Sequence, residues 1–247
     1  MKMRNIRTDH IQHLINSASD SGKGLATLKK IQNLASLLCK FAMANDIIDK
    51  NYAQLIIMPK SEKKADKVSF TREQLDTMWN LQKSDDGIGS ILLLCYTGLR
   101  INEFLDIKKE YVDIDLGIIK APGSKTESGK NRIIALPRVI IPIVEQFLQK
   151  AGEYLYSTAS GKRWNSSNYR NRVFNPTLNK YNLNMSGKIT PHSCRHTYAW
   201  LCVTNGVNQK ATMDLLGHSK YSISAEIYAD ATKKDIDFLC SEANKIK

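Results

Sequence analysis

Apolar residues recur at three- and four-residue spacing through most of this 247-residue chain, and that period constrains its fold more than any other feature. The clearest run extends from Leu25 to about Ala44. Its stripe consists of Leu28, Ile31, Leu34, Leu38 and Phe41. A stripe of this period is typical of an amphipathic helix with one face toward a core. With an earlier helix capped near Thr8, it predicts a small helical unit over residues 1–58.

A charged segment separates this unit from the rest of the chain. Residues 59–68 read PKSEKKADKV, which is typical of an exposed linker between domains. We therefore expect a linker at 59–68, a larger domain at 69–232 and a C-terminal helix at 233–247.

The larger domain begins with a helix start signal. Thr71 and Gln74 have the spacing of a capping box. A buried helix then breaks at Gly98 and is followed by a second, short helix. Residues 116–137 contain two β-type runs around a polar turn, which predicts a small antiparallel sheet.

Helical patterns resume at 139–150 and 168–180 and again after Thr190. Thr190 and Pro191 supply the cap and first-turn residues of that last helix, and Gly206 supplies its stop. The predicted fold class is therefore mainly α with a small antiparallel β-sheet (α+β).

Composition limits the classes of molecule that the protein could bind but does not identify one. The net charge is +12, which suits a polyanion such as nucleic acid but also a lysine-rich soluble surface. The five cysteines form no CxxC pair, so we expect reduced, buried thiols. No apolar leader or membrane-length run is apparent, which favours a cytoplasmic protein.

Two pairs of polar residues have helical spacing. Arg100 and Glu103 lie three apart, as do His192 and Arg195. Two arginines held by such neighbours make a fork-shaped clamp that matches phosphate oxygens. Either pair taken alone is more often a surface or interdomain ion pair.

A further motif follows the second pair. His218 comes directly after Gly217 in LLGHS, and Tyr228 lies ten residues later in a short helical run. A tyrosine in such a run is ordinarily half-buried packing. In combination with the two arginines, however, Tyr228 is also a candidate nucleophile.

The order and spacing of these residues resemble the tyrosine recombinase (phage integrase) family, including integrases of temperate phages and integrative conjugative elements. The resemblance covers about residues 69–235 and rests on TGLRINE, a hairpin lysine, HSCRHT, LLGHS and a tyrosine ten residues on. The matching residues are Arg100, Lys125, His192, Arg195, His218 and Tyr228.

The resemblance implies a DNA-cleaving role for each position. Tyr228 would attack a phosphodiester to leave a 3′-phosphotyrosine, while Arg100 and Arg195 hold the non-bridging oxygens. His192 would handle the proton at the tyrosine, and His218 would donate a hydrogen bond to the phosphate.

Two supporting positions complete the set that the resemblance implies. The hairpin lysine, best matched by Lys125 with Lys130 as the alternative, would protonate the departing 5′-oxygen. Glu103 would support Arg100. The domain at 1–58 would bind the recombination core site. It is shorter than the core-binding domain that is usual in the family, and no arm-site domain is recognisable before it. Both domains would close as a C-shaped clamp around DNA.

The implied function is site-specific DNA recombination without metal, ATP or any other cofactor. A free phenol has a pKa of about 10, so a cationic cluster is needed to make it attack at neutral pH. A type IB topoisomerase-like activity and a catalytically silent DNA-binding regulator on the same fold are the alternatives.

The C-terminal helix carries a narrow apolar stripe of Ile236, Leu239, Ala243 and Ile246. The stripe could fold back on its own domain. The resemblance favours docking into a neighbouring protomer, which would link a homo-tetramer on double-stranded DNA. Accessory DNA-bending proteins and association with the bacterial nucleoid are further expectations, and no membrane partner is expected.

Overall fold

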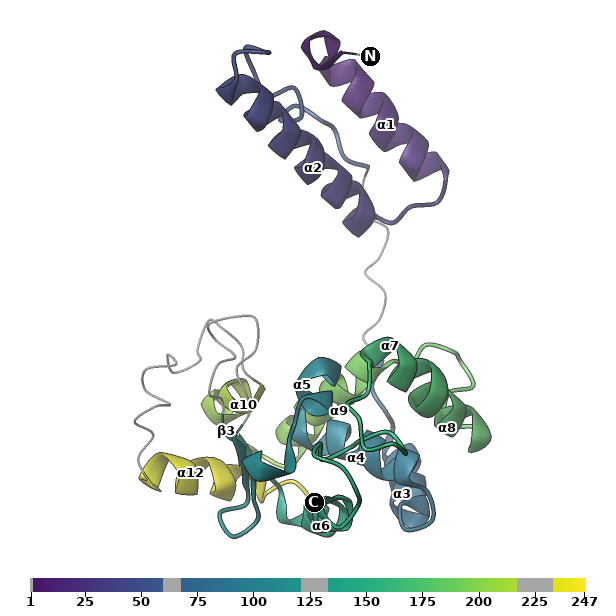
Figure 1. Ribbon diagram of the computed structural model, residues 1–247, viewed down its shortest axis with the longest axis vertical. Helices are drawn as coiled ribbons and strands as arrows, with labels where there is room; N and C mark the ends of the chain where they lie inside the picture. The colour runs from purple at the N-terminus through teal and green to yellow at the C-terminus, as the bar shows by residue number, and fades with distance from the viewer. Residues whose placement is uncertain (1, 60–67, 121–132, 217–232) are drawn as a thin grey trace. The chain divides into compact units, whose positions relative to one another are not determined.

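The computed structural model describes residues 2–59, 68–120, 133–216 and 233–247. The chain divides into two units, Met1–Asp66 and Lys67–Lys247, each with its own hydrophobic core (Figure 1). The roles predicted for these domains stay predictions, and most of the predicted linker lies outside the described residues.

The first unit is built from two helices and a following segment of turns. A short 3-10 turn, η1 (Met3–Asn5), precedes α1 (Thr8–Asp20) and α2 (Leu25–Ala44). Arg7, not Thr8, is the N-cap of α1, and its backbone N–H donates to His10 Nδ1 at 3.1 Å. The buried core consists of Ile11, Ile15, Leu28, Cys39, Ala42, Ile48, Tyr52, Ala53 and Ile56.

The predicted apolar stripe of α2 is only partly correct. Leu28 is buried and Ile31 packs against the core, but the exposed fractions of Leu34, Leu38 and Phe41 are 59%, 53% and 68%. The core-facing register instead continues through Cys39 and Ala42. The prediction failed because α2 is apolar on two neighbouring faces, and α1 covers one of them.

The second unit is centred on two long buried helices. In α4 (Asp86–Thr97), every residue from Gly87 to Thr97 is buried, and α9 (Pro191–Thr204) packs along it. The surrounding helices are α3 (Arg72–Leu81), α5 (Ile101–Leu105), α6 (Ile141–Leu148), α7 (Ser166–Tyr169), α8 (Asn175–Lys180) and α10 (Gln209–Leu216).

Several predicted helix signals are confirmed in this unit. Thr71 and Gln74 form the expected capping box at the start of α3. Helix α9 has Thr190 as N-cap and Pro191 as its first residue, and it ends shortly before Gly206.

A small antiparallel sheet lies beside these helices, as predicted. Its strands are β1 (Val112–Asp113), β2 (Ile118–Lys120) and β3 (Ile133–Ala135), in the order β1-β2-β3. Two 3-10 turns flank it, η2 (Lys109–Tyr111) and η4 (Arg138–Ile140). The mainly α fold with a small sheet is therefore confirmed.

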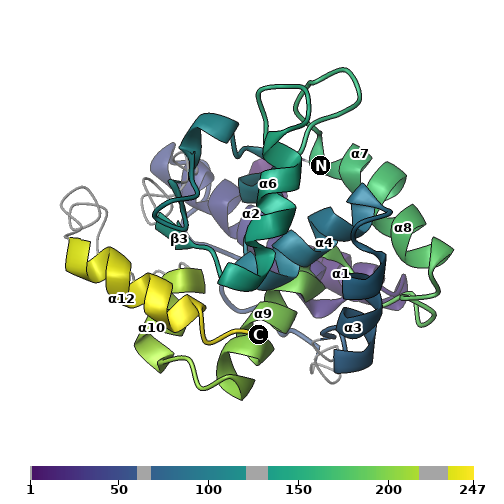
Figure 2. The same cartoon turned by 90° about the horizontal axis from the view of Figure 1, so that it is seen from below.

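The C-terminal helix α12 (Lys233–Ala243) packs on its own unit, beside β3 and α10 (Figures 1 and 2). Leu239, Ala243 and Ile246 are buried in the core of the second unit. Glu242 accepts a hydrogen bond from the backbone N–H of Asn208 at 2.7 Å. In this single chain the apolar stripe is thus covered by fold-back.

The segment predicted as one helix over 168–180 contains an irregularity. Between α7 and α8 lies a π-helical turn, η5 (Arg170–Phe174), in which hydrogen bonds span five residues.

Among the described helices, none combines the length and apolarity needed to cross a bilayer. All five cysteines are free thiols, four of them buried and Cys240 partly so.

Asp85 joins two helices of the second unit. As N-cap of α4 it accepts hydrogen bonds from the Gly87 N–H, Lys180 Nζ and Tyr181 Oη at 2.9, 2.9 and 3.0 Å. Burial raises the pKa of the Asp85 carboxyl, but these hydrogen bonds outweigh it and leave the pKa below its usual value. The charged form is therefore the one that stabilises the fold.

We predict that Asp85→Asn lowers the free energy of unfolding by about 1 kcal/mol at neutral pH. A lowered native pKa stabilises the fold fully above the unfolded pKa of about 4, and this contribution is lost as the pH falls through the native pKa. The difference between Asp85→Asn and wild type should therefore shrink progressively below about pH 4. Urea unfolding followed by tryptophan fluorescence reports this unit, since Trp79, Trp164 and Trp200 all lie in it.

Asp76→Asn is the matched control, because Asp76 is exposed and its one ion pair among the described residues is with exposed Arg72. A gap between Asp85→Asn and wild type that stays constant with pH would contradict the role given to the Asp85 charge.

Candidate phosphate-binding site

The site begins at the turn that ends α4. Gly98 is the C-cap of this helix, with a left-handed φ of 62°, and its N–H donates to Leu94 O at 3.1 Å. A Cβ at this position would lie 2.4 Å from Tyr198 Cδ1 and 3.0 Å from Leu216 Cδ2. Both the backbone conformation and the close neighbours therefore require glycine. Arg100 lies two residues after Gly98 and directly follows this turn.

Arg100 is held by Glu103 at the start of α5. Arg100 Nη1 lies 2.7 Å from Glu103 Oε1, and the Arg100 backbone N–H donates to Glu103 Oε2 at 3.0 Å. The sequence placed both residues on one helix, but Arg100 is the N-cap, with an extended ψ of 147°. The contact forms because a carboxylate at the third helical position reaches back to the cap. The Arg100 side chain remains 50% exposed, so its guanidinium is oriented and open to a ligand.

Arg195 has a different environment in the middle of α9. The residue is 5% exposed, and its Nη1 donates to Gly98 O at 2.7 Å while Nη2 donates to Leu216 O. A buried guanidinium needs such acceptors, because an uncompensated buried charge is strongly destabilising. These bonds tie together α9, the end of α10 and the Gly98 turn. The structure thus brings Arg195 to the loop that carries Arg100.

His192 lies one turn before Arg195 and is exposed, although its neighbours Pro191 and Ser193 in the first turn of α9 are buried. Its ring meets the His196 ring nearly edge-on, with centroids 4.7 Å apart and planes at 82°. The two rings, which lie four residues apart on α9, are therefore in contact.

The middle of α9 is fixed by a buried hydroxyl. Thr197 Oγ1 accepts from the Phe70 N–H at 2.9 Å and donates to Ser193 O at 2.9 Å. The start of the second unit is thereby tied to the helix that carries Arg195.

Other nucleophiles near these helices are held in their neutral form. Burial, reinforced by Cys194, raises the pKa of the Cys95 thiol well above its usual value. Burial likewise raises the pKa of the Tyr96 and Tyr169 phenols. These groups are therefore poor candidates for attack on a phosphate at neutral pH.

The remaining predicted site residues lie outside the described part of the chain. They are Lys125, its alternative Lys130, His218 and Tyr228. Of the predicted set, the structure pairs Arg100 with Glu103 and bonds Arg195 to Gly98, two residues before Arg100. It places His192 on the same helix as Arg195. The catalytic roles of all of them stay predictions.

Two functional groups escaped the sequence analysis, namely the main-chain carbonyls of Gly98 and Leu216. The helix break at Gly98 was visible, but nothing in a sequence marks which carbonyl accepts from a distant arginine. Two Asp-x-Asp pairs, at 113–115 and 235–237, were also passed over. Asp113 Oδ1 accepts from the Leu116 N–H at 3.0 Å, which closes the β1–β2 turn. No cluster of three or more potential metal ligands occurs among the described residues.

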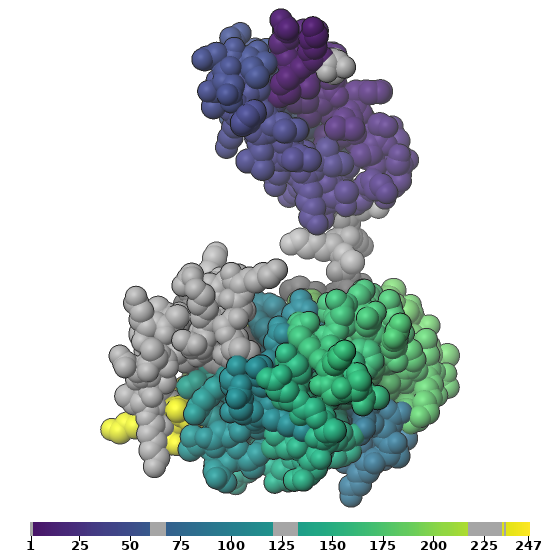
Figure 3. Space-filling model, viewed as in Figure 1, coloured from purple at the N-terminus to yellow at the C-terminus, as the bar shows by residue number. Residues whose placement is uncertain are grey.

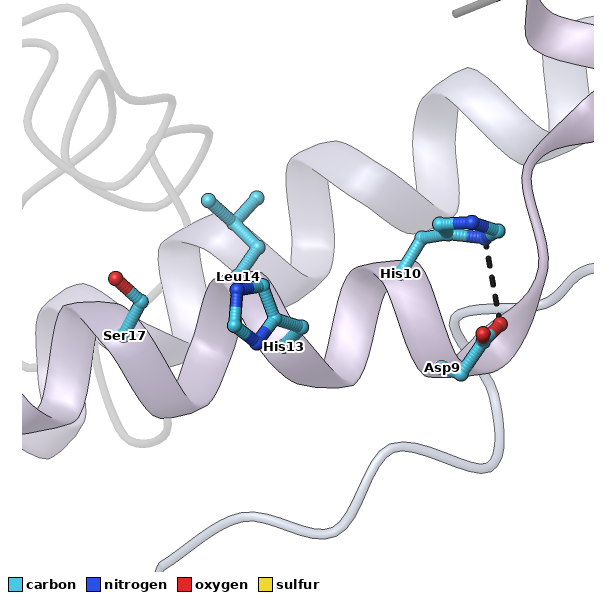
Figure 4. A pocket seen from close by; sticks show the side chains of 5 residues that line it. All are labelled: Asp9, His10, His13, Leu14 and Ser17. Carbon is cyan, nitrogen blue, oxygen red and sulfur yellow. Dashed lines mark ion pairs between the residues drawn. The ribbon is translucent and has the colours of Figure 1, made fainter.

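The first unit has a shallow surface pocket along α1 (Figure 4). It is lined by Asp9, His10, His13, Leu14 and Ser17, and His10 Nδ1 lies 3.3 Å from Asp9 Oδ1. Both histidines are exposed. None of the predicted site residues lies in this pocket.

Comparison with known proteins identifies the family. The model of the phage integrase family matches residues 69–235. The chain belongs to the phage integrase family, which confirms the resemblance seen in the motifs.

Named relatives are tyrosine recombinases. XerA of Thermococcus kodakarensis is 30% identical over 197 residues, covering 77% of this chain and 65% of the relative. XerD of Staphylococcus haemolyticus is 27% identical over 236 residues, covering 92% of this chain and 79% of the relative. The match spans 65%, 54% and 64% of the length of three archaeal XerA proteins.

Solved structures share the fold. The Tn1549 transposon integrase in complex with transposon right end DNA has a TM-score of 0.74 at 20% identity, covering 96% of this chain and 85% of that one. A lambda integrase dimer bound to a COC′ core site has a TM-score of 0.70 at 20% identity, covering 88% and 80%.

Replacing Gly98 tests the geometry of the site. We predict that Gly98→Ala lowers the free energy of unfolding by about 3 kcal/mol, since it adds left-handed strain to a clash with Tyr198. Gly206→Ala is a matched control, because Gly206 has a similar φ of 68° but no atom within 4 Å of the position that an added Cβ would take. Gly206→Ala should lower the free energy of unfolding by about 1 kcal/mol. Equal losses in urea unfolding would contradict the close contact.

Proposed function

We propose that this chain is a site-specific DNA recombinase that cleaves and rejoins strands through a 3′-phosphotyrosine. The observation that supports the proposal is the bond from Arg195 to Gly98 O, which ties Arg195 to the turn that leads into Arg100. Membership in the phage integrase family and the net charge of +12 support it.

The two arginines would bind the phosphate that reacts. Guanidinium donors match pairs of phosphate oxygens and stay charged at any working pH. As the phosphorus becomes five-coordinate, negative charge accumulates on its equatorial oxygens. Fixed donors aimed at such charge are each worth a factor of about 10² to 10³ in rate. Glu103 would keep Arg100 in position, and the carbonyls of Gly98 and Leu216 would do the same for Arg195.

The nucleophile in this proposal is Tyr228. Its phenolic oxygen forms a bond to phosphorus, the bond to the 5′-oxygen breaks, and the departing 5′-oxygen takes a proton from the hairpin lysine, Lys125 or Lys130. His192 would accept the phenolic proton, and His218 would donate a hydrogen bond to the phosphate. Because the phosphotyrosine keeps the energy of the phosphodiester, a second 5′-hydroxyl reseals the strand without ATP.

The substrate would be double-stranded DNA bearing recombination core sites, bound by both units as a clamp. The DNA-bound Tn1549 and lambda integrases have the same fold. We further propose a homo-tetramer on DNA, as lambda integrase forms on a Holliday junction. Helix α12 would leave its own core to dock on a neighbour. A bacterial cytoplasmic location, near the nucleoid, and help from DNA-bending proteins go with this proposal.

Tyrosine replacement tests the proposal directly. We expect Tyr228→Phe to bind DNA normally and to form no covalent protein–DNA adduct, since it lacks the attacking oxygen. The substrate is a nicked duplex carrying the DNA that flanks the reading frame, and adducts are read on denaturing gels. Tyr221→Phe, seven residues earlier, is the matched control and should form adducts as wild type does. An adduct in Tyr228→Phe would assign the nucleophile elsewhere.

A further inference from the structure

Helix α2 has a second apolar face, which the rest of its unit leaves exposed. Its members are large apolar side chains with exposed fractions of 53% to 68%, and they are Leu34, Leu37, Leu38 and Phe41. We call these four residues the outer face of α2. They recur at three- and four-residue spacing, so they line one side of the helix. Figures 1 and 3 show α2 at the surface of the first unit, beside α1.

The outer face differs from a side of α2 that simply faces solvent. Lys29, Asn33 and Lys40 are exposed on another side of the same helix, and they are polar, as contact with water favours. Single exposed apolar side chains are common on soluble proteins. Four that share one side of a helix instead form a contiguous apolar patch, and such a patch marks a site of interaction.

Opposite charges lie at the two ends of the outer face. Lys30 lies one turn before Leu34, and Asp46 follows the last turn of α2. Both are exposed, and within the described residues of the first unit neither charge takes part in an ion pair. The two charges are nearly symmetric about the midpoint of the face. Lys30 comes seven residues before Leu37, and Asp46 comes eight residues after Leu38.

We infer that the outer face of α2 binds the same face of a second copy of this chain, with the two helices antiparallel. A two-fold axis through the midpoint sets Leu34 of each copy against Phe41 of the other. The same axis brings Lys30 of each copy to Asp46 of the other, so the charges are complementary at both ends of the interface. A parallel arrangement would instead bring like charges together.

The size of the face sets the strength of this dimer. Stable interfaces bury about 1,200–2,000 Å² in total, and one helix face of four large side chains gives less than that. We therefore expect a weak dimer in exchange with the monomer. The dimer needs no DNA and involves the first unit alone, so it is independent of the proposed strand cleavage. Failure of either proposal leaves the other standing.

Sedimentation equilibrium of the full chain, free of nucleic acid, tests the apolar contact. Wild type should dimerise as its concentration rises, and Leu37→Gln should raise the dimer dissociation constant by about tenfold or more, because two buried leucines are lost. Leu37 is 63% exposed in the single chain, so the variant should fold. Leu55→Gln is the matched control, because Leu55 is 78% exposed and lies outside α2. A wild type that stays monomeric, or a Leu37→Gln chain that dimerises as wild type does, would overturn the inference.

Exchange of the two charges tests the antiparallel arrangement. At low ionic strength, Lys30→Glu and Asp46→Lys should each raise the dissociation constant by about 3- to 10-fold, because each brings like charges together at both ends of the interface. The chain with both substitutions should recover the wild-type value. Lys40→Glu is the matched control, since it makes the same charge change on another side of α2 and should have little effect. A double variant that dimerises no more tightly than the single ones would contradict the antiparallel dimer.

Discussion

The second unit depends on one buried guanidinium. Arg195 donates to the main-chain carbonyls of Gly98 and Leu216, which lie at the ends of α4 and α10. Arg195 is only 5% exposed, and its buried charge is tolerated because these carbonyls accept its hydrogen bonds. The acceptor at Gly98 is available because only glycine fits that turn. The same turn sets the direction of the chain into Arg100, so the buried and the exposed arginine are placed by one piece of backbone.

This arrangement separates two tasks within the proposed mechanism. Arg195 is immobilised by its surroundings, whereas Arg100 is oriented by Glu103 and stays half exposed. One guanidinium is thus preorganised inside the protein and the other faces an incoming phosphate, an economical way to stabilise developing charge.

Much of this fold follows from local rules in the sequence. Periodicity predicted α2 and the paired strands, and cap residues predicted the starts of α3 and α9. What could not be predicted depends on tertiary contacts. Arg100 proved to be a cap because Glu103 reaches back to its N–H. Leu34, Leu38 and Phe41 are exposed because α1 covers only one of the two apolar faces of α2. The π-turn follows from the joint burial of Tyr169 and Phe174. The main-chain carbonyls that accept from Arg195 could not be predicted, because every residue has such a group and no side chain marks the ones that are used.

The central claim is that Arg100 and Arg195 neutralise charge on one phosphate. Its most direct test is adduct formation by Arg100→Ala and Arg195→Ala on two duplexes, one natural and one with an uncharged methylphosphonate at the cleaved position. On the natural duplex each variant should be slower than wild type by about 10²-fold or more. On the methylphosphonate duplex both deficits should shrink to less than about tenfold, because the charge that the arginines offset is gone. A deficit that stays unchanged for either variant would contradict the claim.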